Sequence, residues 1–168
     1  ALKAFQQVDN KKIIDLVTSV GITPEISNGY IHEAHCIGAS TGSNPLTMAG
    51  AYQIFSNGGY FYEPYAVSKI VFRTTGEEDT YSSPKQKIIS DSTAYMINMI
   101  LRYAVTSGHV SAGTVSGTDV AAKTGTSTVD YNRLQELGLQ YKSVIGDAWQ
   151  VSYSPDYTIS LWYGYNEL

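Results

Sequence analysis

The stretch over residues 120–127, Val-Ala-Ala-Lys-Thr-Gly-Thr-Ser, constrains the fold of this chain more than any other. Its small and β-branched residues suit a buried strand, and Gly125 removes a side chain where something must approach the backbone closely. Lys123 supplies a positive charge, and hydroxyl donors come from Thr124, Thr126 and Ser127. Together they fit an edge strand that binds an anionic, peptide-like ligand by strand addition. Taken alone, the same residues also fit an ordinary strand end with a surface lysine.

Length and composition predict one soluble globular domain. The chain has 168 residues, of which 43% are hydrophobic and 15% charged, enough for one real core. A net charge of −4 without a basic run argues against nucleic-acid binding. No apolar stretch approaches the ~18 residues of a membrane span, and the low charge and 14 tyrosines resemble those of an extracytoplasmic domain. Cys36 is the only cysteine, so no internal disulfide is expected.

The residues around Cys36 raise the alternative of a metal site. His32 and His35 would share a face on a helix, and a thiolate beside them would be a possible zinc ligand. However, the surrounding sequence reads as a loop, and the remaining histidine, His109, is far along the chain. We therefore expect a polar surface loop here and no metal site.

The first third of the chain predicts two helices separated by a loop. Asp9 caps a helix from Asn10 to Val20, whose buried side is made by Ile13, Ile14, Leu16 and Val17. Residues 21–44 read as a long loop. Ser43 or Asn44 then caps a second helix, which has Pro45 at its first position, runs to Ser56 and stops at Asn57-Gly58-Gly59.

The middle of the chain predicts a small hairpin and the longest helix. A short strand is expected over 65–73 and a turn over 75–79, so the hairpin would end near Tyr81. Ser90 or Asp91 caps a helix that runs to about Thr106, and its apolar side is Ala94, Ile97, Ile100, Leu101 and Ala104.

The last third predicts three strands. Residues 111–118 are small and polar, and the strand over 120–127 follows them. Residues 128–143 are mixed, with one helical turn expected around 134–137. An antiparallel hairpin then pairs 147–153 with 157–165 around Ser154-Pro155-Asp156. A long helix followed by three strands favours an α+β fold, in which helices pack on an antiparallel sheet.

Several segments also carry short motifs in a fixed order. Residues 44–52 read Asn-Pro-Leu-Thr-Met-Ala-Gly-Ala-Tyr, and Phe-Ser-Asn-Gly-Gly at 55–59 and Pro64 follow. Residues 123–127 have the form K-T-G-T-[ST], after the helix expected over 90–108. Asp147-Ala148-Trp149, residues 153–157 and residues 162–164 come next. Over nearly the whole chain, this order resembles the transpeptidase domain of penicillin-binding proteins, specifically the bifunctional class A type, and implies a β-lactamase/transpeptidase-like fold.

The sequence departs from that family at two motifs. The family's acyl transfer uses S-x-x-K with the nucleophile, S-x-N and K-T-G, and this chain contains no Ser-x-Asn. Residues 1–5 resemble those that follow the family's S-x-N, so we expect residues 1–168 to be the C-terminal portion of the domain. The string Ser82-Ser83-Pro84-Lys85 matches S-x-x-K, but it reads as a polar loop, whereas the chemistry needs both residues one helical turn apart. We expect it not to hold the nucleophile.

For a complete domain, the resemblance implies a serine acyl-enzyme that needs no cofactor. The serine attacks the D-Ala-D-Ala bond of a peptidoglycan stem peptide, an amine of a second stem takes the acyl group, and β-lactam antibiotics acylate the same serine. Lys123 would attract the substrate carboxylate and tune the proton network. The Thr126 backbone N–H would be one arm of the oxyanion hole. In the same strand, the hydroxyls of Thr124 and Thr126 would bind the carboxylate, Gly125 would admit the ligand backbone, and Ser127 would complete the substrate-binding surface.

Some side chains of this region also have purely structural interpretations. Thr126 fits a cross-strand packing residue, and Asp147 fits a cap of the turn at the start of its strand. Trp149 and Trp162 are expected in the core on a sheet face, with the wall of a peptide groove as the alternative.

Two functions of different classes follow. In the first, the chain is part of an acyl-transfer enzyme at the extracytoplasmic face of the bacterial membrane, and is inactive without the upstream half of its domain. In the second, it is a non-catalytic module that binds a peptide or a partner. A β-lactamase or carboxypeptidase shares the K-T-G motif, but the segments at 44–52 and 147–149 argue against it. An isolated half-domain would expose apolar surface, so we expect marginal stability, aggregation or self-association.

Overall fold

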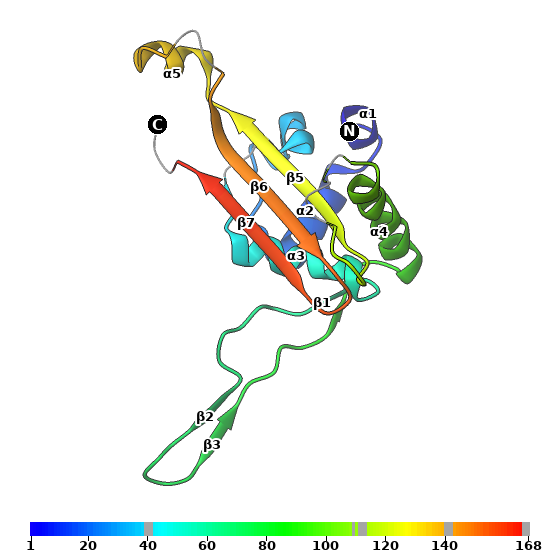
Figure 1. Cartoon of the computed structure of the whole chain (residues 1–168), viewed down its shortest axis with the longest axis vertical. Coiled ribbons are helices and arrows are strands. Elements are labelled where there is room, and N and C mark those ends of the chain that lie inside the picture. Colours follow the sequence, from blue (N-terminus) through cyan, green and yellow to red (C-terminus); the bar gives the residue numbers. More distant parts are fainter. Residues whose placement is uncertain (39–41, 109, 111–113, 140–142, 166–168) are drawn as a thin grey trace.

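A three-stranded antiparallel sheet organises the structure, and helices pack on one face and along one edge of it (Figure 1). The computed structural model describes residues 1–38, 42–108, 110, 114–139 and 143–165. Four predictions touch residues outside these ranges: part of the loop over 21–44, His109, part of the polar segment over 111–118 and part of the segment over 128–143. The order of β5 (Ala121–Thr128), β6 (Ile145–Tyr153) and β7 (Thr158–Gly164) in space follows their order in the chain. The predicted α+β architecture is confirmed.

The remaining elements precede the sheet or lie in its connections. Four short strands form two small two-stranded sheets, in which β1 pairs with β4 and β2 pairs with β3. The helices and short strands are α1 (Leu2–Phe5), α2 (Asn10–Ser19), the 3-10 helix η1 (Glu33–Ile37), α3 (Pro45–Ser56), β1 (Tyr60–Phe61), β2 (Lys69–Val71), β3 (Glu78–Thr80), β4 (Gln86–Lys87), α4 (Asp91–Thr106) and α5 (Tyr131–Glu136).

Local capping explains why the predicted helices begin where they do. The Asp9 carboxylate accepts the backbone N–H of Lys11 at 2.8 Å and starts α2. Asn44 accepts the N–H of Thr47 at 2.9 Å at the start of α3, with Pro45 in the first helical position. Ser90 accepts the N–H of Thr93 at 3.1 Å and starts α4. These three helices are confirmed, and Asn44 and Ser90 are the caps.

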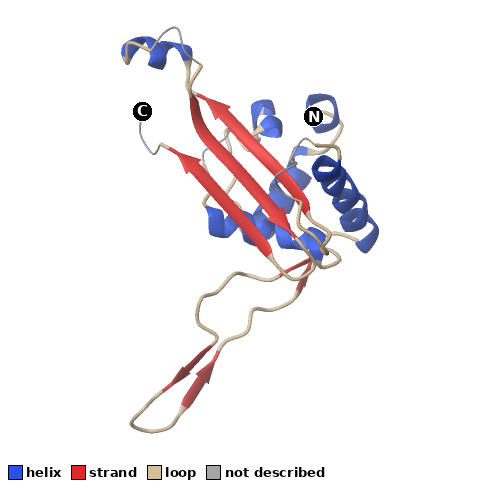
Figure 2. Cartoon of the chain, viewed as in Figure 1, coloured by secondary structure: helices blue, strands red, loops and turns tan. Residues whose placement is uncertain are grey.

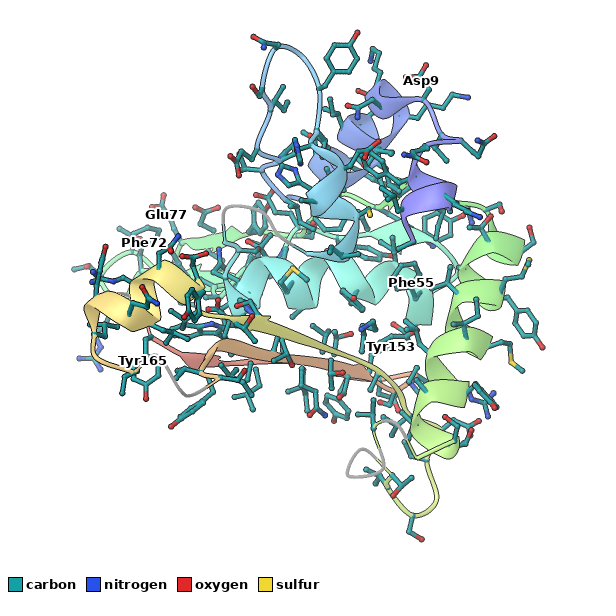
Figure 3. The ribbon with its side chains drawn as sticks, turned by 90° about the horizontal axis from the view of Figure 1, so that it is seen from above. Asp9, Phe55, Phe72, Glu77, Tyr153 and Tyr165 are labelled. Atoms are coloured by element: carbon teal, nitrogen blue, oxygen red, sulfur yellow. The ribbon has the colours of Figure 1, made fainter. Side chains whose placement is uncertain are left out.

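Two buried clusters of the core lie between the sheet and the two longest helices. α3 packs against β6 and β7, and α4 packs against α3 and β5. Figure 3 shows Phe55 of α3 and Tyr153 of β6 facing each other between these layers, with ring centroids 6.5 Å apart. Leu101 of α4 joins Tyr153 and Ala121 in one buried cluster, while a second cluster holds Val105, Val110 and Ala122. α4 is therefore anchored on the first two residues of β5.

The predicted buried side of α2 is partly wrong, and the apolar side of α4 is partly exposed. Leu16 of α2 is 42% exposed and Ile100 of α4 is 61% exposed. On α4, Ile100 belongs to an exposed apolar side with Tyr95, Met96, Met99 and Tyr103. Helical periodicity correctly identifies an apolar stripe, but this stripe is wider than the surface that α3 and β5 cover.

On the opposite face of the sheet, the apolar side chains of β7 are exposed. Along β7, Ile159, Leu161 and Tyr163 are 62–75% exposed, and they alternate with half-buried Ser160 and Trp162. Within the described residues, helices pack on one face of the sheet only (Figure 3). The prediction of exposed apolar surface is met in this chain, whereas instability and self-association stay predictions.

The hairpin of β2 and β3 projects away from the body of the molecule (Figures 1 and 2). The hairpin was expected, but its first strand covers only Lys69–Val71 instead of 65–73. Lys69 pairs with Glu78 at 2.5 Å, and Tyr65 makes an edge contact with Tyr81, at 4.9 Å between ring centroids. Beyond these few residues the two chain segments separate, so no longer ladder forms.

One segment holds a helix that the loop prediction missed, and another holds a helix that begins earlier than predicted. The 3-10 helix η1 lies within the predicted loop over 21–44. Helix α5 begins at Tyr131, three residues before the predicted turn, because the Asp130 carboxylate accepts the N–H groups of Asn132 and Arg133. Both starts are capped by a side chain, His32 in η1 and Asp130 in α5.

Candidate active-site strand

β5 is an edge strand whose second half is open. It pairs with β6 along one edge, and among the described residues no strand pairs with its other edge. Ala121 and Ala122 are buried at 2% and 0% exposure, while all six residues from Lys123 to Thr128 are exposed. The strand is therefore fixed at one end by α4 and free at the other, which is what addition of a ligand strand requires.

Strand alternation divides the predicted site residues between the two faces of the sheet. Lys123, Gly125 and Ser127 lie opposite Val151, Trp149 and Asp147 of β6, on the face where Tyr153 meets α3. Thr124 and Thr126 lie opposite Gln150 and Ala148, on the other face. A ligand along the free edge would meet both sets, since side chains of both faces flank an edge strand.

The Lys123 ammonium group stays on its own strand. Its Nζ donates to the backbone carbonyl of Thr124 at 2.5 Å. Within the described residues it forms no ion pair with a carboxylate. Lys123 is thus an exposed cation on the open half of the strand and is available to an anionic ligand.

Gly125 has room for a side chain as far as the fold is concerned. A Cβ built there would have Trp149 Cβ as its nearest neighbour at 3.4 Å, an ordinary van der Waals contact. Its φ is also not positive, so the backbone does not demand glycine. The packing of this chain therefore gives no reason for a glycine at this position.

A hydrogen-bond network that the sequence did not reveal crosses all three strands beside Ser127. The Ser127 hydroxyl donates to Oδ2 of Asp147 at 2.6 Å, and the Trp162 indole N–H donates to Oδ1 of the same carboxylate at 2.9 Å. These two bonds hold the pKa of Asp147 below its ordinary value of 3.8, and the bond from Ser127 has the larger effect. Asp147 is therefore a carboxylate at neutral pH, and its interpretation as a turn cap is wrong, because it lies inside β6.

A β-bulge adjoins this network. Ser127 pairs with Asp147 and Thr128 with Ile145, so Gly146 has no partner on β5. On the other side of β6, a Cβ on Gly164 would lie 2.4 Å from the Gly146 carbonyl oxygen and 3.0 Å from Trp162 Cζ2. The indole of Trp162 lies against Gly164 and reaches Asp147 from there, so this glycine is required by close packing.

The two tryptophans lie on the sheet face that α3 covers. Both are half-buried, with ring centroids 6.4 Å apart. Neither is a fully buried core residue, and Trp162 also has the polar role of fixing Asp147. The register of β6 and β7 decides this placement, since Trp149 and Trp162 are direct cross-strand partners.

The S-x-x-K-like string lies outside any helix. Ser82, Ser83, Pro84 and Lys85 form the segment between β3 and β4. The Lys85 ammonium group lies 3.9 Å from the ring centroid of Tyr60. The geometry that brings a serine and a lysine together on one helical turn is therefore not present in this segment.

The histidine cluster has structural roles in the described part of the chain. The His32 ring accepts the N–H of Ala34 at 3.2 Å and caps η1, and His35 lies 3.8 Å from a Glu25 carboxylate oxygen. No group of three or more His, Cys, Asp or Glu residues among the described residues has a geometry that would hold a metal ion. In the same residues, no helix is long and apolar enough to cross a membrane.

Comparison with known proteins identifies a single family. The profile described as "Penicillin binding protein transpeptidase domain" matches residues 6–163. Penicillin-binding protein 1A/1B of Bacillus subtilis is 37% identical over 99% of this chain, and the match covers 18% of that protein. Penicillin-binding protein 1A of Streptococcus pneumoniae is 26% identical over 97% of this chain and 25% of its own length. The chain thus spans about a fifth to a quarter of these relatives.

Solved structures share the fold. The penicillin-binding protein PonA1 from Mycobacterium tuberculosis superposes with a TM-score of 0.75 at 19% identity, over 99% of this chain and 44% of that one. Penicillin-binding protein 3 from the same organism, complexed with aztreonam, superposes with a TM-score of 0.74 at 20% identity, over 96% of this chain and 41% of that one. In both, the match covers less than half of the solved chain.

Proposed function

Because the chain belongs to the penicillin-binding protein transpeptidase domain family of peptidoglycan synthesis, we propose that residues 1–168 are the C-terminal portion of a serine D,D-transpeptidase domain. The observation that carries this proposal is the open half of β5, where Lys123, Gly125 and Ser127 and the hydroxyls of Thr124 and Thr126 flank an unpaired edge. An extended peptide ending in a carboxylate fits such a strand in shape and in charge.

In the proposed reaction, a serine from an upstream segment attacks the carbonyl carbon between the two D-alanines of a stem peptide. The C–N bond breaks, the terminal D-alanine leaves with a proton on its amine, and the remaining acyl group is an ester on the serine. An amine of a second stem peptide then attacks this ester and frees the serine. A β-lactam would acylate the same serine through its ring carbonyl.

The residues of β5 have separate roles in this proposal. Lys123 attracts the terminal carboxylate, and the hydroxyls of Thr124 and Thr126 donate hydrogen bonds to it. The Thr126 N–H stabilises the oxyanion of the tetrahedral intermediate, a contribution of about 3 kcal/mol for one such donor. Gly125 keeps the strand surface clear for the ligand. Its neighbour in the packed sheet leaves room for a Cβ, which supports a ligand-related reason for the glycine.

The uncovered half of the sheet face supports an upstream partner segment. On the face that α3 covers near Tyr153, the side chains of Lys123 and Ser127 remain exposed. The nucleophile must approach the peptide bond held on β5, so we place the upstream segment against this half of the face. We also propose that the parent protein acts at the extracytoplasmic face of the bacterial membrane, where stem peptides are cross-linked.

Labelling with a fluorescent penicillin, followed by mass spectrometry, tests the proposal. We expect no adduct on the 168-residue chain alone and a stoichiometric adduct on the longer protein that carries it, at a serine upstream of Ala1. An adduct at Ser82 of the isolated chain would overturn the assignment of the nucleophile to an upstream segment. A longer protein that stays unlabelled would instead support a non-catalytic, peptide-binding module.

A further inference from the structure

The network beside Ser127 determines what its hydroxyl group offers to a ligand. A hydroxyl has one hydrogen to donate and two lone pairs to accept with. Asp147 accepts through both carboxylate oxygens, Oδ2 from Ser127 and Oδ1 from Trp162. Because an ionised carboxylate is an acceptor only, the Ser127 hydrogen must point to Asp147 and not toward the open edge of β5.

The orientation of the Asp147 carboxylate is fixed by more than this one bond. The Trp162 indole holds the second oxygen, and the indole itself lies against Gly164. Ser127, by contrast, is exposed on the open half of β5. The rigid part of the network therefore lies in β6 and β7, and the exposed hydroxyl at its end is oriented by it.

Charge at this end of the strand has the sign opposite to that at Lys123. Within the described residues no cation pairs with Asp147, so its negative charge is offset only by hydrogen bonds. Lys123 lies four residues away on the same face, roughly 13 Å along an extended strand. A carboxylate is thus attracted to the Lys123 end, and a hydrogen-bond donor to the Ser127 end.

We propose that Asp147 is a positioning residue that presents Ser127 to the ligand as a hydrogen-bond acceptor only. The Ser127 end of β5 is then a subsite for an N–H donor, an amide or ammonium group of the peptide, and not for its carboxylate. The identity of the ligand rests on the proposed function, whereas the network that orients Ser127 does not. The proposal also divides the hydroxyls of the strand: Thr124 and Thr126 donate to the carboxylate, and Ser127 accepts from the peptide backbone.

Amide-to-ester substitution in the substrate tests the subsite. In the longer, penicillin-reactive protein, kcat/KM for D-alanine release is measured with stem peptides in which one amide at a time is replaced by an ester. The ester lacks the N–H, so at the position facing Ser127 the wild type is expected to lose about tenfold. In S127A and in D147N the same ester is expected to cost less than about twofold, because the oriented acceptor is gone.

Matched controls keep the result specific. D156N removes the same charge from the β6–β7 turn and is expected to retain the wild-type ester penalty at every position. S127A leaves the bond between Asp147 and Trp162 in place. The ester penalty in S127A therefore still tests the subsite if D147N fails to fold. Equal ester penalties in wild type, S127A and D147N at every position would overturn the proposal.

A second measurement is independent of the proposed function. In the 15N spectrum of the longer protein, the indole N–H signals of Trp149 and Trp162 are assigned with W149F and W162F. D147N is expected to shift the Trp162 signal and leave that of Trp149 in place, while D156N shifts neither. An unchanged Trp162 signal in D147N would refute the network itself. If penicillin did not acylate the wild-type protein at all, the proposed function would be refuted. The Trp162 signal in D147N would still show whether the hydrogen-bond network exists.

Discussion

A methyl group added at Gly125 distinguishes what the fold requires from what the ligand requires. The new Cβ would lie 3.4 Å from Trp149 Cβ, at ordinary contact distance, and φ is not positive there. Replacing glycine by alanine at such a compatible site stabilises a protein by about 0.4–1 kcal/mol, because the unfolded chain loses freedom. We therefore expect the free energy of unfolding of G125A to equal or slightly exceed that of the wild type.

The effect on the ligand has the opposite sign. Gly125 lies between Lys123 and Ser127 on one face of β5, so a ligand that contacts both must pass over it. A methyl group inserted into such a close contact costs about 1–3 kcal/mol. Since 1.4 kcal/mol is a factor of ten, acylation by penicillin should slow roughly 5- to 150-fold.

The assay combines urea unfolding, followed by circular dichroism, with the rate of labelling by a fluorescent penicillin in the longer protein. Gly164→Ala is the matched control in the same sheet. Its Cβ would lie 2.4 Å from the Gly146 carbonyl oxygen, so G164A should lose about 1–3 kcal/mol of stability. If G125A loses as much stability as G164A, or is acylated at the wild-type rate, the reasoning about Gly125 is wrong.

Four further predictions concern Tyr153, Ser90 and Asp147. The Tyr153 hydroxyl is buried without a hydrogen-bond partner among the described residues. Y153F should therefore raise the free energy of unfolding by about 1 kcal/mol in urea melts at neutral pH. A clear loss of stability in Y153F would mean that the hydroxyl has a hydrogen-bond partner. Burial raises the pKa of Tyr153 above 10.0, so the stability difference between wild type and Y153F should grow as pH rises past 10, where the unfolded phenol ionises first. S90A removes the cap of α4 and should lower the free energy of unfolding by about 1 kcal/mol. An unchanged urea midpoint would contradict this. Hydrogen bonds from Ser127 and Trp162 lower the pKa of Asp147 below 3.8, so the stability that this carboxylate contributes is present above pH 3.8 and lost as pH falls further. D147N should therefore flatten the acid side of the plot of stability against pH. An unchanged slope in D147N would contradict this.

Local signals account for the parts of the fold that the sequence predicted well. Asp9, Asn44 and Ser90 each bond a backbone N–H only two or three residues away, so a short window contains both partners. The C-terminal hairpin is similar, since the Ser154 N–H bonds the Tyr157 carbonyl across the turn at 2.8 Å. The motif around Lys123 also lies within a single strand, and its residues became visible as a candidate site without any knowledge of their neighbours.

Burial was predicted less well because it depends on what packs against an element. Leu16 and Ile100 follow the helical period, yet both are exposed. The strand expected over 65–73 is rich in apolar residues but pairs at only three positions. In each case the sequence pattern identifies the apolar residues of the segment correctly. How many of them are buried or paired depends on which other segments of the chain pack against it.

The sequence by itself determined the helix starts, the turns and the family motif on β5, because each depends on contacts between near neighbours. Only the tertiary structure decided which edge of β5 is open, which hydroxyls are free to donate, and that Asp147 holds Ser127 and Trp162. These last three residues are separated by 15 and 20 positions along the chain, and the register of three strands with a bulge at Gly146 brings them together. Register is a cooperative property of the assembled sheet, so no single segment contains the information that sets it.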